Sequence, residues 1–146
     1  MCGDSSPRDS LGGALAVLSP LQFSAGASAL PLSGRLVFYN GKTASAMATH
    51  AIFTPDSSLE RDPMKTEPCV LRVHETGDLR TPLAESPSLT TSMLKPVAGI
   101  IGNSLEFELE RPLTIGFGND GIIGRKVSIW TQHGAGPLAE GIIGYN

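Results

Sequence analysis

The sequence is poor in cysteine, in aromatic residues and in positive charge. Its 146 residues include two cysteines and one tryptophan, and aromatic residues make up 5%. Two cysteines are too few for a disulfide framework, which favours a reducing compartment. Eleven Lys and Arg against fourteen Asp and Glu give a net charge of −3, which supplies no attraction to nucleic acid or to an anionic membrane. We therefore expect neither nucleic acid nor a membrane as a partner.

Long apolar runs are also missing, so no segment has the length of a membrane-spanning helix. The short apolar run at residues 11–18 follows Asp4, Arg8 and Asp9, a net negative start where a secretory signal carries positive charge. These features argue against secretion. They predict an intracellular protein, or one assembled in a particle such as a virion.

The sequence contains no phosphate-binding glycine loop, dinucleotide fingerprint, zinc-ligand spacing, calcium loop or serine nucleophile elbow. We therefore predict no catalytic residue, no metal and no cofactor. The absence of these motifs favours a non-enzymatic role, although it leaves the question of an enzyme open.

What the sequence does have is the period-two alternation of β-strands. Residues 105–110 place three apolar side chains on one face and three glutamates on the other. Residues 36–39, followed by Asn40-Gly41, predict a hairpin with residues 43–53, since Asn-Gly suits a tight type I′ turn. Further strand patterns are found at residues 69–74, 113–117, 126–131 and 138–143. The sequence thus predicts an all-β fold, an antiparallel sandwich or small barrel of about seven or eight short strands.

Composition divides the chain into two parts. Residues 1–33 are rich in Ser, Gly, Ala and Pro and predict a flexible N-terminal arm, while residues 34–146 predict a single β domain. Six of the eleven prolines fall between residues 54 and 104, which predicts a long loop-rich insertion. Within it, residues 88–94 could form one short helical turn.

The tetrapeptide Gly-Ile-Ile-Gly occurs three times, beginning at residues 99, 121 and 141. Adjacent isoleucines on a strand point to opposite faces, so each pair requires burial on both sides or one face covered by a partner. The alternative is a coincidence of composition in a glycine-rich β protein. The first interpretation gives six interface candidates: Ile100, Ile101, Ile122, Ile123, Ile142 and Ile143.

The three histidines, His50, His74 and His133, could gather on a metal inside a cupin-like barrel, but their spacing favours scattered structural positions. Trp130 lies near His133 and could line a pocket, although half-buried packing is the commoner role for a lone tryptophan. These four residues are the weak pocket candidates of the sequence.

Small residues, turn glycines and two-faced isoleucine pairs suit a subunit whose surface continues into its neighbours. The sequence therefore predicts a structural, self-assembling or interaction protein, such as a viral capsid, capsid-decoration or other shell or appendage subunit. We expect its partners to be further copies of the chain or companion subunits. One alternative is a ligand- or glycan-binding barrel, and a second is a small cupin-like enzyme.

Overall fold

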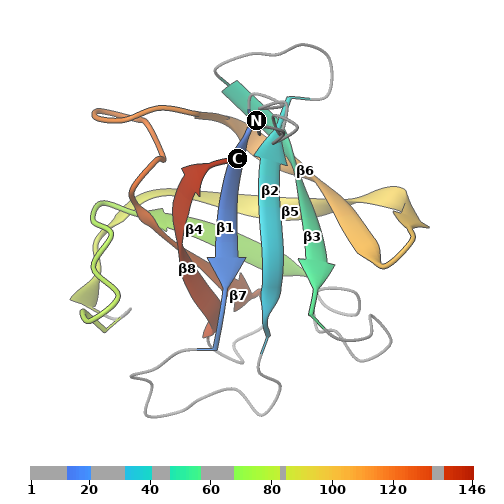
Figure 1. Ribbon diagram of the computed structural model, residues 1–146, viewed down its shortest axis with the longest axis horizontal. Coiled ribbons are helices and arrows are strands. Elements are labelled where there is room, and N and C mark those ends of the chain that lie inside the picture. Colours follow the sequence, from blue (N-terminus) through green and yellow to red (C-terminus); the bar gives the residue numbers. More distant parts are fainter. Residues whose placement is uncertain (1–12, 21–31, 41–46, 57–67, 83–84, 133–136) are drawn as a thin grey trace, which may run out of the picture.

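The computed structural model describes residues 13–20, 32–40, 47–56, 68–82, 85–132 and 137–146. Eight strands form one closed barrel in the order β1-β2-β3-β6-β5-β4-β7-β8, and β8 pairs with β1 to complete it (Figure 1). The strands are β1 (Ala14–Leu18), β2 (Gly34–Tyr39), β3 (Met47–Pro55), β4 (Cys69–His74), β5 (Ser88–Ile101), β6 (Ser104–Thr114), β7 (Lys126–Thr131) and β8 (Pro137–Tyr145).

All neighbouring strands are antiparallel, and two long crossings set the topology. One crossing runs from β3 to β4 and the other from β6 to β7, each to a strand three positions further along the barrel. As a result, β3 neighbours β6 and β4 neighbours β7. In Figure 1, β1, β2, β3 and β8 stand upright at the front of the barrel, with β1 and β3 pointing down and β2 and β8 pointing up, while β4 and β5 cross behind them. The all-β prediction is confirmed, in its small-barrel form.

The alternation of side chains fills the barrel with an apolar core. Phe38, Phe53, Leu71 and Ile129 are fully buried, and they belong to one cluster with inward residues of the other strands. A barrel of eight strands has an interior just wide enough for such side chains. Burying each of them stabilises the fold by about 2 kcal/mol relative to leaving it in water.

Several local predictions hold in detail. β7 has the predicted bounds, and β6 buries Phe107 and Leu109 while Glu108 and Glu110 face water. The sequence Asn119-Asp120-Gly121, which favours a turn, forms one, with Asn119 at a positive φ of 38°. Such a conformation is tolerated by asparagine better than by most other residues, because its short polar side chain can hydrogen-bond locally.

The predicted arm over residues 1–33 contains the first barrel strand. Ala14, Ala16 and Leu18 of β1 are buried, and β1 pairs with both β2 and β8. Small inward side chains are compatible with a crowded barrel wall, although they make a weak strand pattern in the sequence. Residues 14–18 are therefore barrel and not arm, whereas residues 1–12 and 21–31 lie outside the described residues.

The hairpin prediction is right in its pairing and wrong in its turn. β2 pairs with β3, but Tyr39 lies opposite His50, so the connection is longer than the two residues that Asn40-Gly41 predicted. The Asn40 side chain donates a hydrogen bond of 3.1 Å to the Met47 carbonyl across the mouth of this connection. Residues 41–46 lie outside the described residues.

Two prolines lie inside strands, at positions where the sequence predicted a loop or a break between strands. Residues 88–94 are extended and belong to β5, which continues through Pro96, so the predicted helical turn is wrong. The pairing of β5 with β6 shifts register just after Pro96. β6 likewise continues through Pro112, which lies where its pairing with β3 shifts register. Bulges of this kind accommodate proline, because its missing N–H removes no ladder hydrogen bond there.

Candidate functional site

The structure separates the predicted histidines. His50 lies half-buried on β3, with its ring 5.6 Å from that of Tyr39 and its Nδ1 atom 2.8 Å from the Thr49 hydroxyl. His74 ends β4, which is not a neighbour of β3 in the barrel, and His133 lies outside the described residues. Within the described ranges, no three His, Cys, Asp or Glu side chains are grouped as metal ligands. The cupin-like alternative therefore gains no support from these positions.

His74 instead belongs to a directed chain of hydrogen bonds. The Trp130 indole donates to the Ser128 hydroxyl at 2.7 Å, and that hydroxyl lies 2.7 Å from His74 Nε2. His74 Nδ1 lies 3.2 Å from the Ser86 carbonyl oxygen, which can only accept. Nδ1 therefore carries the proton, and Nε2 accepts the proton of the Ser128 hydroxyl.

A serine hydroxyl bonded to a neutral imidazole is the pair that nucleophilic hydrolases use, but here it is sealed. Ser128 is fully buried and His74 is 1% exposed, so no substrate can reach either group in this conformation. The pKa of His74 is lowered, first by burial and further by the positive charges of Lys126 and Arg72. A buried, neutral and fully hydrogen-bonded imidazole acts here as a structural group.

Trp130 is covered by a cation. The guanidinium carbon of Arg72 lies 4.4 Å from the centre of the indole ring, at cation–π distance. The two side chains come from β4 and β7, which pair directly. Arg72 Nε is buried without a hydrogen-bond partner, so the contact with the ring is the main interaction of that part of the guanidinium within the described chain.

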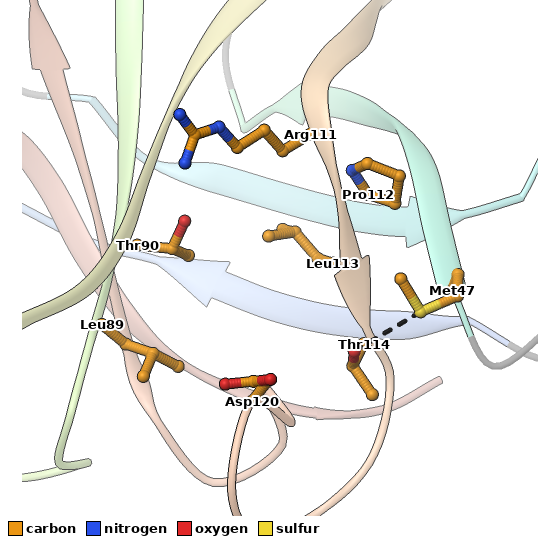
Figure 2. Close-up of a pocket in the computed structure, with 8 residues that line it drawn as sticks. All are labelled: Met47, Leu89, Thr90, Arg111, Pro112, Leu113, Thr114 and Asp120. Atoms are coloured by element: carbon orange, nitrogen blue, oxygen red, sulfur yellow. Dashed lines mark hydrogen bonds between the residues drawn. The ribbon is translucent and has the colours of Figure 1, made fainter.

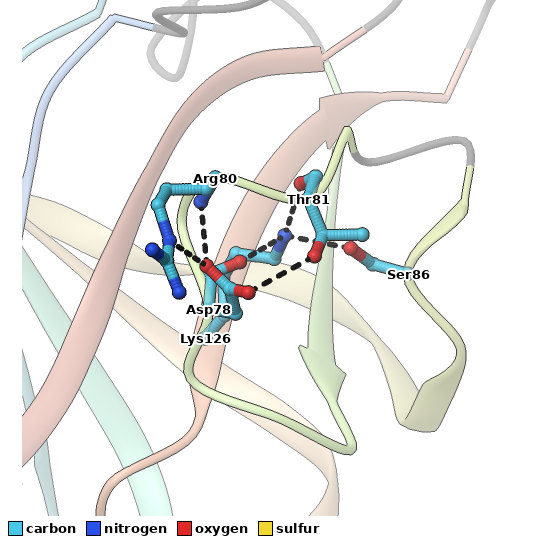
Figure 3. Close-up of polar contacts among 5 residues, drawn as sticks. All are labelled: Asp78, Arg80, Thr81, Ser86 and Lys126. Carbon is cyan, nitrogen blue, oxygen red and sulfur yellow. Dashed lines mark hydrogen bonds and ion pairs between the residues drawn. The ribbon is translucent and has the colours of Figure 1, made fainter.

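Lys126 is buried beside these hydrogen bonds and is held by residues 75–82 and 85–87, the described residues of the segment that joins β4 to β5. Its ammonium donates to the Asp78 carbonyl at 3.2 Å, the Thr81 carbonyl at 2.9 Å and the Ser86 hydroxyl at 2.7 Å (Figure 3). Burial lowers the pKa of Lys126, although the negative charge of Glu140 opposes that shift. All three ammonium protons have acceptors, which makes a fully buried lysine tolerable.

Other hydrogen bonds fix the start of this segment, at residues 75 and 76, over the outside of the barrel. The Lys126 backbone N–H donates to the Thr76 carbonyl at 2.9 Å, and the Arg125 guanidinium donates to the Glu75 carbonyl at 2.6 Å. We call the group beneath this segment the polar cluster: Arg72, His74, Lys126, Ser128, Trp130 and Glu140. Of these six, sequence reasoning singled out only His74 and Trp130. The alternation Lys126, Ser128, Trp130 marks one polar face of β7, but nothing in the sequence shows that described residues of the segment between β4 and β5 cover it.

A second feature is an exposed apolar surface on the other side of this segment. Phe117 and Tyr145 are 73% and 59% exposed, and their rings meet edge to face with centres 5.7 Å apart. Val17 of β1 is 61% exposed, and Ile142 of β8 is half-buried. We call these four residues the apolar face. Two adjacent exposed aromatic rings have a large apolar surface, and exposing that surface to water is energetically unfavourable for a monomeric protein.

Backbone contacts connect the members of the apolar face. A side-chain carbon at Gly141 would lie 2.3 Å from the Val17 carbonyl oxygen, so β1 and β8 approach closely beside Ile142. Such a carbon at Gly124 would lie 4.0 Å from the Phe117 ring, and the Gly124 N–H donates to the Ile143 carbonyl at 2.7 Å. These contacts place β1, β8 and residues 116–124 next to one another, and within the apolar face the rings of Phe117 and Tyr145 are in contact.

Three of the four isoleucine side chains that the structure describes in these pairs serve the chain's own core. Ile122 is fully buried, Ile123 is 6% exposed and Ile143 is 1% exposed, so these three side chains offer almost no surface to a partner. The side chains of Ile100 and Ile101 lie outside the described residues. Of the six predicted interface residues, Ile142 is the one whose described side chain reaches the surface.

Comparison with known proteins adds no family. Neither the protein-family models nor the curated proteins with which the sequence was compared contain a match to it. A bilayer-spanning helix, which has to be both long and apolar, is not found among the described residues.

Proposed function

We propose that the protein is a non-catalytic interaction subunit that associates with a second copy of itself through the apolar face. The observation that carries this proposal is the exposed pair of Phe117 and Tyr145, at 73% and 59%. Exposed aromatic side chains in contact with each other are the residues that most often dominate binding energy at protein interfaces.

A second copy is the occupant that the charge pattern favours. The apolar face contains no ionisable side chain other than the phenol of Tyr145, whereas the whole chain carries a net charge of −3. Two identical apolar faces can meet about a two-fold axis without burying an unpaired charge. A closed barrel offers no free strand edge, so side-chain packing is the route to association that remains.

The narrower interpretation, a capsid, capsid-decoration or other shell subunit, stays a prediction. One self-complementary face produces a dimer, and a shell needs at least one further interface. The filled barrel favours neither alternative of the sequence analysis, since its inward residues form a hydrophobic core.

Sedimentation velocity at several protein concentrations tests the proposal. We expect a concentration-dependent dimer for the unchanged protein, and at least about a hundredfold weaker association for the double variant Phe117→Ser, Tyr145→Ser. Met47→Ser is the control for the loss of an exposed apolar side chain, because Met47 lies on β3 and is not one of the four residues of the apolar face. A strictly monomeric unchanged protein at high concentration would refute self-association. Equal dimerisation of the double variant would refute the assignment of the face.

A further inference from the structure

An open pocket lies on the barrel wall where β5 and β6 pass the start of β3. It has a volume of about 320 Å³, within the range of pockets that hold small molecules. Figure 2 shows its lining side chains, which fall into three kinds. They are apolar (Met47, Leu89, Pro112 and Leu113), hydroxyl-bearing (Thr90 and Thr114) and charged (Arg111 and Asp120).

The two charged side chains face the pocket from opposite sides. In Figure 2, Arg111 lies at one end and Asp120 at the other, with Leu113 between them. The only ion pair within the described part of the chain joins Arg80 and Asp78, so Arg111 and Asp120 pair neither with each other nor with another described residue. Both charges are free to bind a ligand.

The surface between the charges is apolar and firmly held. Leu113 is 4% exposed and belongs to the core cluster, while Leu89 is partly buried and packs against that cluster. The Thr114 hydroxyl donates to Met47 Sδ at 3.4 Å, which connects β6 to β3 beside the pocket. The core therefore supports the floor of the pocket, while Arg111 and Asp120 are exposed at its two ends.

We propose that this pocket binds a small molecule with a carboxylate at one end, an ammonium at the other and a short apolar chain between them, that is, an ω-amino acid. The guanidinium of Arg111 suits a carboxylate, with which it can form two parallel hydrogen bonds. Asp120 supplies the counter-charge for the ammonium. The apolar side chains between them would cover the methylene groups of the ligand.

A simple anion fits this arrangement less well. Arg111 alone would serve an anion such as a fatty acid carboxylate, but Asp120 would then repel it or remain unpaired. An α-amino acid carries both charges on one carbon and cannot reach two groups on opposite sides of the pocket. The separation of the charges therefore favours the ω-amino acid.

Titration of ¹⁵N-labelled protein, followed by NMR, tests the proposal with 6-aminohexanoate as the probe. Hexanoate and hexylamine are the controls, since each keeps the chain and one charge. We expect saturable shifts with a dissociation constant of about 1 mM, at residues that line the pocket. We expect binding of 6-aminohexanoate to be about tenfold or more tighter than that of either control.

Charge-removing variants then assign the two ends. Arg111→Gln should weaken the binding of 6-aminohexanoate and of hexanoate about tenfold or more and leave the binding of hexylamine unchanged. Asp120→Asn should weaken the binding of 6-aminohexanoate and of hexylamine by a similar factor and leave the binding of hexanoate unchanged. Arg35→Gln and Asp56→Asn remove exposed charges of the same kind elsewhere and should change nothing. Hexanoate binding as tightly as 6-aminohexanoate would overturn the proposal in favour of an anion site. Absence of saturable shifts at tenfold above the expected constant would overturn it outright.

Discussion

Acidification below the ordinary pKa of histidine should destabilise the fold through His74. Burial is the main cause that lowers the pKa of His74 in the folded protein, where Lys126 and Arg72 add positive charge around it. The unfolded chain exposes the imidazole, whose pKa returns to 6.5. Below that pH the unfolded state binds a proton that the folded state does not bind. The contribution of neutral His74 to stability is therefore complete above about pH 6.5 and is lost as the pH falls.

The size of the loss follows from the unfolded pKa. If His74 stays neutral in the folded protein, proton binding to the unfolded chain lowers the free energy of unfolding by about 2 kcal/mol between pH 7.5 and pH 5. Glu140 acts in the opposite direction, because burial raises the pKa of its carboxyl group and so favours the folded state as the pH falls. The difference between the unchanged protein and a His74 variant isolates the histidine.

Urea unfolding at a series of pH values measures this difference. His74→Gln keeps an acceptor for the Ser128 hydroxyl but has no group that titrates in this range. We expect it to lower the free energy of unfolding by about 1–2 kcal/mol at pH 7.5 and to close the gap to the unchanged protein as the pH falls to 5. A gap of the same size at both pH values would show that His74 is not the titrating group.

Three further outcomes can be measured by the same unfolding assay at pH 7.5. Lys126→Met should destabilise the fold by about 2 kcal/mol, because the Ser86 hydroxyl and two carbonyls lose a charged donor, and an unchanged stability would mean that water replaces it. Gly34→Ala should cost about 2–3 kcal/mol, since its new carbon would lie 2.4 Å from a β3 carbonyl oxygen, whereas the control Gly144→Ala meets nothing within 4 Å. Trp130→Phe should cost about 1–2 kcal/mol through the lost indole hydrogen bond, and a neutral result would refute its place in the polar cluster.

Where one strand face is wet and the other buried, the sequence predicted the fold well. The Leu-Glu alternation of residues 105–110 and the bounds of residues 126–131 are both reproduced in the barrel. Both strands contain large apolar residues at every second position, which is the pattern that a half-buried strand requires. The turn at residues 119–121 also depends on its own residues, since Asn119 itself adopts the positive φ.

Features that depend on distant parts of the chain were not predictable in this way. β1 has small inward residues and takes its place only because β2 and β8 flank it. Lys126 has the sequence context of a surface cation, and it is buried because residues 75–82, with Ser86, cover β7. The isoleucine pair at residues 122–123 points into the chain's own core, which a tetrapeptide cannot reveal. In each case the local sequence pattern allows a side chain to be either buried or exposed, and tertiary packing decides which.

The segment that seals the polar cluster also bounds the apolar face, and the meeting point is Gly77. A side-chain carbon there would lie 2.2 Å from the Gly124 carbonyl oxygen and 3.6 Å from Ile142 Cδ1. Only a residue without a side chain lets the segment lie this close to residues 116–124. The hydrogen bonds of Lys126 pull the same segment onto β7. Burial of a lysine on one side of Gly77 therefore helps to fix the edge of the surface that Phe117 and Ile142 present on the other.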